Sequence, residues 1–108
     1  MKKLILANTL IVILFLGACN FNQYKPIGSG NLLESRFGFK EEKIAHNKWL
    51  ISYETVGGTK DAEALKLLYR RIDEFGKQQC KKGFKSEKPD ILASDVGVTS
   101  TAILTCNE

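Results

Sequence analysis

The stretch Trp49-Leu50-Ile51-Ser52-Tyr53-Glu54-Thr55-Val56-Gly57-Gly58 marks the point where the periodicity of the chain changes. Before the glycines, β-branched and aromatic residues alternate with polar ones, apart from Leu50, and this alternation is typical of a strand. After the glycines, apolar residues recur at intervals of three and four, as they do on one face of a helix. The sequence therefore predicts a strand over residues 49–56 that leads through a tight turn into a helix.

The predicted helix runs over about residues 60–80. Thr59 or Asp61 is placed to cap its N-terminus, and Gly83 is placed to follow its C-terminus. One side of the helix carries an apolar stripe that suits packing on a sheet. This stripe consists of Leu65, Leu68, Tyr69, Ile72, Phe75 and Gln79.

A second clear strand is predicted over residues 96–106. Alternate side chains of this strand are apolar and point to one side, where the helix is expected to pack. These side chains are Val96, Val98, Ala102, Leu104 and Cys106.

Weaker patterns complete the expected domain. Short strands are predicted within residues 36–46 and 84–86, and residues 87–95 are predicted to form a loop with Ile91 and Leu92 folded inward. The sequence thus predicts an α+β domain of two layers. One long helix packs on a small sheet of three or four strands, which is antiparallel or mixed.

The N-terminus has the three parts of a secretory signal. Lys2 and Lys3 form a basic start, the thirteen residues 4–16 are uncharged and mostly apolar, and Leu16-Gly17-Ala18-Cys19 follows. Thirteen residues are too few for a membrane-spanning helix, which needs about 20. The four residues that end in Cys19 resemble the lipobox of bacterial lipoproteins.

That resemblance implies a signal peptide over residues 1–18 and an acylated Cys19 that anchors the chain to a lipid bilayer. An ordinary signal peptide with a chance cysteine is the alternative. By resemblance to lipoprotein sorting, Asn20 favours the outer membrane over the inner one, because retained lipoproteins usually carry Asp at this position. The expected location is the cell envelope: the periplasmic side of the outer membrane in a Gram-negative cell, and otherwise the outer face of the cytoplasmic membrane.

Two cysteines remain after Cys19. An even pair in an exported chain indicates a disulfide, so Cys80 and Cys106 are predicted to be bonded. A metal or redox site with two cysteines is the alternative, but the chain has no C-x-x-C motif and a single histidine.

The charge of the chain is less basic than it first looks. The net charge of +4 includes Lys2 and Lys3, and without them 14 basic residues stand against 12 acidic ones. No basic cluster of the kind that binds nucleic acid is present in the sequence.

Residues 19–35 are interpreted as a lipidated tether that precedes a single domain over residues 36–108. Pro26 and the run Gly28-Ser29-Gly30 have the composition of a flexible linker. An ordered N-terminal strand in this segment is the alternative.

No catalytic, metal or cofactor site is predicted. His46 lies in a charged stretch without placed partners, G-x-S-x-G is absent, and Gly57-Gly58-Thr59-Lys60 lacks the frame of a phosphate-binding loop. The pairs Arg70-Arg71 and Lys81-Lys82 are interpreted as a solvated face, or as a surface for anionic headgroups or an anionic envelope polymer.

A second resemblance covers residues 36–84. It rests on an ordered series: Arg36-Phe37-Gly38-Phe39-Lys40-Glu41, Ile44, Trp49-Leu50-Ile51-Ser52-Tyr53, Gly57-Gly58-Thr59, Ala62, Leu68-Tyr69-Arg70-Arg71 and Cys80-Lys81-Lys82-Gly83-Phe84. This series is similar to that of a group of small bacterial lipoproteins without an established activity. Where their helix has Arg-Ala-Ala-Glu, this chain has Arg71-Ile72-Asp73-Glu74. The resemblance implies location and fold but no mechanism.

The leading hypothesis is a non-enzymatic envelope lipoprotein that presents its domain to a protein partner or to the cell-wall layer. The alternative is a domain that senses a ligand or stress in the periplasm. An enzyme ranks third, because no catalytic constellation is signalled.

Overall fold

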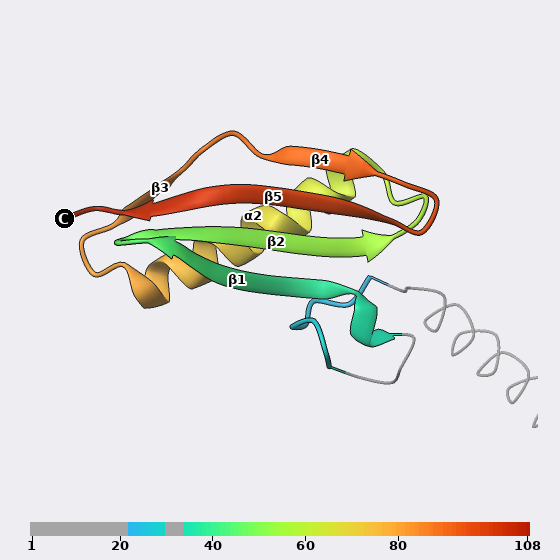
Figure 1. Cartoon of the computed structure of the whole chain (residues 1–108), viewed down its shortest axis with the longest axis horizontal. Coiled ribbons are helices and arrows are strands. Elements are labelled where there is room, and N and C mark those ends of the chain that lie inside the picture. Colours follow the sequence, from blue (N-terminus) through green and yellow to red (C-terminus); the bar gives the residue numbers. More distant parts are fainter. Residues whose placement is uncertain (1–21, 30–33) are drawn as a thin grey trace, which may run out of the picture.

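The computed structural model describes residues 22–29 and 34–108 (Figure 1). The predictions for the signal peptide, for Cys19 and for Asn20 lie outside these residues. The elements are a 3₁₀ turn η1 (Glu34–Arg36), strands β1 (Gly38–Ala45) and β2 (Lys48–Val56), helix α2 (Asp61–Gln79), and strands β3 (Phe84–Ser86), β4 (Asp90–Ala93) and β5 (Gly97–Cys106).

The predicted α+β class is confirmed: α2 packs on one face of a five-stranded sheet whose strands pair antiparallel (Figure 1). The strand order is β1-β2-β5-β3, and β4 lies beside β3 along the same edge of β5. The sheet therefore has one strand more than the upper number predicted. The additional strand, β4, lies in the predicted loop 87–95, where it pairs with residues 98–101 and satisfies backbone groups of β5 that β3 is too short to reach.

The register of β2 against β5 builds the core. Ile51 lies opposite Ala102 and Tyr53 lies opposite Ser100, and the side chains of all four are buried beneath α2. The opposite face of the sheet carries the remaining residues of these strands, among them Ser52 and Thr101. One face is therefore apolar and covered, as the period-two pattern predicted.

Four predicted inward positions are instead exposed, among them Gln79 in the last turn of α2. Leu92 is 74% exposed, Val96 69% and Tyr69 49%. Leu92 lies opposite Thr99, on the sheet face away from α2, and Val96 precedes β5 in the turn from β4. Tyr69 lies beside the buried Leu68, at the edge of the helix stripe.

The helix begins without a side-chain cap. Its N-cap residue is Lys60, and the predicted caps Thr59 and Asp61 do not cap it. The Thr59 hydroxyl instead donates a hydrogen bond of 2.7 Å to the carbonyl of Val56.

Gly76 is buried on the sheet side of the helix, against the ring of Phe84.

Residues 22–29 of the predicted tether lie against the domain. The Phe39 N–H donates to the carbonyl of Lys25, and the Ile27 N–H donates to the carbonyl of Phe39, each at 2.9 Å. These bonds form a short parallel bridge between Pro26 and Phe39. The flexible-linker interpretation is therefore wrong for these residues, because they add backbone hydrogen bonds to the edge of β1.

Candidate functional site

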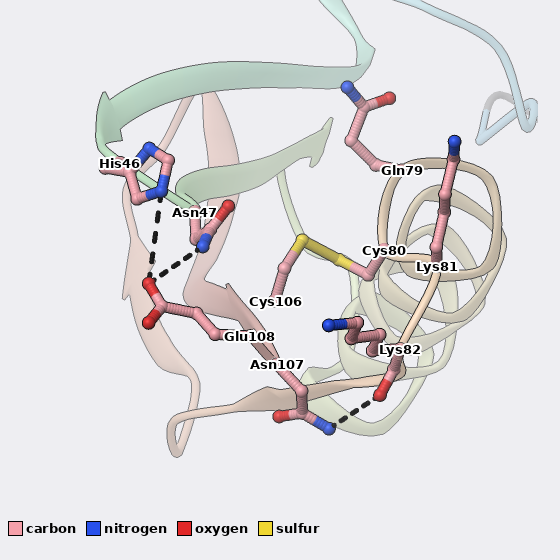
Figure 2. A pocket seen from close by; sticks show the side chains of 9 residues that line it. All are labelled: His46, Asn47, Gln79, Cys80, Lys81, Lys82, Cys106, Asn107 and Glu108. Atoms are coloured by element: carbon pink, nitrogen blue, oxygen red, sulfur yellow. Dashed lines mark hydrogen bonds and ion pairs between the residues drawn. A yellow bond between two sulfur atoms is a disulfide. The ribbon is translucent and has the colours of Figure 1, made fainter.

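A polar hollow of about 470 Å³ opens at the end of the molecule where α2 ends and β5 ends (Figure 2). Three parts of the chain meet there: the turn between β1 and β2, the segment after α2, and the C-terminal residues. Its lining consists of His46, Asn47, Gln79, Cys80, Lys81, Lys82, Cys106, Asn107 and Glu108.

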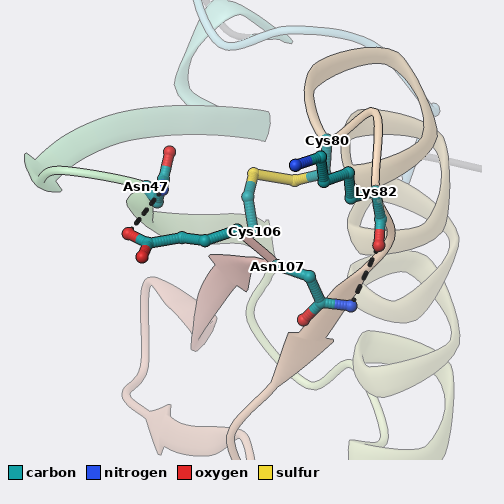
Figure 3. Close-up of a disulfide and its surroundings, with 6 residues drawn as sticks. Asn47, Cys80, Lys82, Cys106 and Asn107 are labelled. Carbon is teal, nitrogen blue, oxygen red and sulfur yellow. Dashed lines mark hydrogen bonds between the residues drawn. A yellow bond between two sulfur atoms is a disulfide. The ribbon is translucent and has the colours of Figure 1, made fainter.

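The disulfide between Cys80 and Cys106 forms the floor between these parts (Figure 3). The bond confirms the predicted pairing. It joins the residue that follows α2 to the last residue of β5, and their Cα atoms are 5.1 Å apart. Both cysteines are buried, so the covalent link belongs to the core as well as to the hollow.

Hydrogen bonds hold the rim on both sides of the disulfide. The Asn107 side chain donates a bond of 3.1 Å to the carbonyl of Lys82, and the Asn107 N–H donates one of 2.9 Å to the carbonyl of Gly83. The Asn47 side chain donates a bond of 3.1 Å to Glu108. The Cys106 N–H also donates a backbone hydrogen bond of 2.8 Å to the carbonyl of Asn47. Backbone bonds therefore fix the walls of the hollow on both sides of the disulfide.

The charged groups of the hollow are exposed. Lys81 and Lys82 lie on the helix side, while His46 and Glu108 lie on the hairpin side with their side chains 3.9 Å apart (Figure 2). The two lysines also complement the negative C-terminal end of the helix macrodipole. Two ammonium groups beside amide donors make an arrangement that can bind a carboxylate or phosphate group at the surface.

Arg70 and Arg71 lie elsewhere, near the middle of α2. The Arg70 guanidinium lies 3.8 Å over the ring of Tyr24, and that of Arg71 lies 4.1 Å over the ring of Phe39. Arg71 also pairs with Glu41 of β1. The four basic residues predicted as an interaction surface therefore do not gather in one place: one pair stacks on aromatic rings, and the other borders the hollow.

The cluster around Arg70 and Arg71 includes a tyrosine with an altered ionisation. Burial of Tyr24, together with the hydrogen bond that it donates to Glu74, raises the pKa of its hydroxyl well above the usual range. The same bond lowers the pKa of the Glu74 carboxyl below its ordinary value, with a further contribution from Arg70. Burial also raises the pKa of Tyr53, whose hydroxyl donates to the carbonyl of Gln23.

Sequence reasoning missed residues both in the cluster around Arg70 and Arg71 and in the hollow at the disulfide. Tyr24 and Glu74 are 50 residues apart, and Arg71 and Glu41 are 30 apart. No local pattern links such positions. Asn107 and Glu108 had one usable signal, because they directly follow a cysteine that was predicted to be bonded.

Residues 22–29 and 34–108 hold no group of three His, Cys, Asp or Glu side chains arranged to bind a metal ion. Over the same two ranges, no helix has both the length and the apolar character needed to cross a bilayer. Comparison of the chain with models of protein families, with curated proteins and with solved structures found no match.

Proposed function

We propose that this chain is a lipid-anchored envelope protein that presents a small, disulfide-linked domain to a partner in the aqueous layer, and that it acts by binding rather than by catalysis. One observation carries the anchor. Of the three cysteines, Cys80 and Cys106 are bonded to each other, and Cys19 remains, directly after Leu16-Gly17-Ala18. The disulfide also supports export, because such bonds persist in oxidising compartments.

The contact surface that we propose is the polar hollow at the disulfide. Lys81 and Lys82 border it, and the amide groups of Asn47 and Asn107 lie on the same rim. This chemistry suits a partner that carries carboxylate or phosphate groups, such as an acidic protein surface or an anionic envelope polymer.

The anchor is tested by Cys19→Ala in the full-length chain. We expect this variant to lose the acyl mass on its N-terminal peptide and to be released from membranes or left unprocessed, because two or more acyl chains are needed for stable attachment. The double variant Cys80→Ala/Cys106→Ala is the control, since it removes the other cysteines and should remain in the membrane fraction. A processed, membrane-bound Cys19→Ala protein would contradict the proposal.

The contact surface is tested by crosslinking in intact envelopes. Lys81→Gln/Lys82→Gln should lower the yield of crosslinked partner several-fold. Lys66→Gln/Lys88→Gln is the matched control, because it removes the same charge from exposed positions that do not line the hollow. Equal losses in the two variants would show that net charge, and not this site, attracts the partner.

A second function is favoured by the size of the hollow. A volume of about 470 Å³ is within the range of small-molecule sites, which span roughly 300–1,000 Å³. The domain would then sense a small anionic ligand in the periplasm. Thermal shift of the purified domain with a panel of carboxylates and phosphates tests this function, and a shift that Lys81→Gln/Lys82→Gln abolishes would favour it over a macromolecular partner.

A further inference from the structure

The side chain of Asn22 is hydrogen-bonded to one end of the sheet. Its side-chain oxygen accepts a hydrogen bond of 3.0 Å from the N–H of Val56, the last residue of β2. Its side-chain nitrogen donates a bond of 2.9 Å to the Thr59 hydroxyl, just before α2 begins. The start of the described chain is therefore fixed where β2 ends.

Cys19 precedes Asn22 by three residues. An extended chain spans at most about 3.6 Å per residue, so the backbone of Cys19 lies within roughly 11 Å of Asn22. An acyl group on Cys19 therefore brings the Val56–Thr59 turn close to the bilayer, whatever path the three residues take.

The same end of the molecule exposes two large aliphatic side chains. Val56 pairs with Gly97 of β5, and Val96, the residue before Gly97, is 69% exposed. Leu92 belongs to the same β4–β5 hairpin and is 74% exposed. Figure 1 shows this hairpin turn and the start of the described chain at one end, with the C-terminus at the other.

On the basis of the proposed acylation of Cys19, we infer that the domain stands on the bilayer with its β4–β5 turn and the start of α2 against the lipid headgroups. The charged residues next to the β4–β5 turn and the start of α2 are Lys60, Asp61, Glu63 and Asp95, and their sum is negative. Anionic lipid repels this negative sum, so electrostatic attraction does not produce the orientation. The short connection and the exposed apolar residues determine the orientation.

The opposite end then points into the aqueous layer. β5 has ten residues, which span about 30 Å along the sheet. The hollow at the disulfide is thus held about 30 Å from the headgroups, beyond the ~8 Å over which charges act at physiological salt. Lys81 and Lys82 face a soluble or wall-bound partner rather than the lipid that carries the anchor.

The orientation is tested with the full-length protein, processed in cells and reconstituted into vesicles of phosphatidylethanolamine and phosphatidylglycerol. The photocrosslinking residue p-benzoylphenylalanine replaces Val96 in one sample and Ile44 in the other. Ile44 is a matched control, because it is 46% exposed and lies beside the β1–β2 turn at the disulfide end. Illumination should give several-fold more lipid adduct from position 96 than from position 44.

Insertion of a twelve-residue Gly-Ser linker between Cys19 and Asn22 should equalise the two yields, because the domain can then rotate freely. The mass of the N-terminal peptide reports acylation in every sample. Equal yields, or a higher yield at position 44, from acylated protein without the linker would overturn the orientation and leave the anchor standing. Protein without an acyl group on Cys19 would overturn both.

Discussion

The Tyr24 hydroxyl donates a hydrogen bond of 2.5 Å to the carboxylate of Glu74, which lies 50 residues further along the chain. Arg70 covers the ring of the same tyrosine, and Tyr24 in turn packs on Phe39 with ring centroids 5.0 Å apart. These contacts make the N-terminal segment part of the domain core. Substitution of Tyr24, or of the α2 residues that contact it, should therefore change the free energy of unfolding of the whole domain.

Tyr24→Phe should make the domain less stable near neutral pH and have little effect in acid. The bond from Tyr24 lowers the pKa of Glu74 below its ordinary value of 4.5. A lowered carboxyl pKa stabilises the fold above the ordinary value, and this stabilisation disappears as the pH falls through the lower value in the folded state. Urea unfolding of both proteins at several pH values measures the difference.

Tyr69→Phe is the control for this prediction. Tyr69 lies on the same helix, but it is 49% exposed and outside the Tyr24 cluster. Its substitution should leave the pH dependence of unfolding unchanged. A difference between Tyr24→Phe and the parent protein that stays constant down to pH 3 would rule out the linkage to Glu74.

Arg71→Gln should destabilise the domain more than Arg70→Gln. The Arg71 side chain is 14% exposed, and its partner Glu41 is 17% exposed, so the substitution leaves a nearly buried carboxylate without its cation. Removal of one partner from such a bond costs about 1–3 kcal/mol. Arg70 is 58% exposed, and loss of its pair with Glu74 should cost at most about 1 kcal/mol. Denaturant unfolding ranks the two variants, and equal costs would contradict the prediction.

Removal of the disulfide should lower the free energy of unfolding by about 3.5 kcal/mol, which is the chain-entropy value for a loop closed over 26 residues. Cys80→Ala/Cys106→Ala and reduction of the parent protein should give similar losses, measured by chemical denaturation at one temperature. A loss below about 1 kcal/mol in both would show that the reduced, unfolded chain retains structure near these residues.

Gly76→Ala should destabilise the domain although alanine favours helix by about 1 kcal/mol. A Cβ atom at position 76 would lie 2.4–2.6 Å from three ring atoms of Phe84, closer than packing allows. The forced shift should cost about 1–3 kcal/mol. In a Phe84→Leu background the same substitution should cost less or become favourable, and a double-mutant cycle of unfolding free energies measures this coupling.

Where burial follows local periodicity, the sequence was sufficient to predict which side chains are buried. Ile51, Tyr53, Leu68, Ile72 and Phe75 are buried as their periods predicted. The disulfide was also predictable, because Cys80 and Cys106 are the pair that remains after Cys19 in a chain with an export signal. The burial signal depends only on the geometry of one element at a time, and the cysteine signal depends only on the composition of the chain.

Positions at the ends and edges of elements were not predictable in this way. β4 forms because β5 offers an edge longer than β3 can cover, and this depends on the registers of three strands. Residues 22–29 have the composition of a linker, yet the edge of β1, the side chain of Glu74 and the backbone N–H of Val56 supply their partners.

The sequence by itself determined the α+β class, the helix and its covered sheet face, because hydrophobic period and turn residues are local properties of the chain. Only the tertiary structure decided which basic residues reach solvent. Arg71 and Lys81 look alike in sequence, but one pairs with Glu41 from a distant strand and the other borders a hollow. A charged side chain takes its role from the groups that folding brings within a few ångströms, and sequence spacing does not encode that distance.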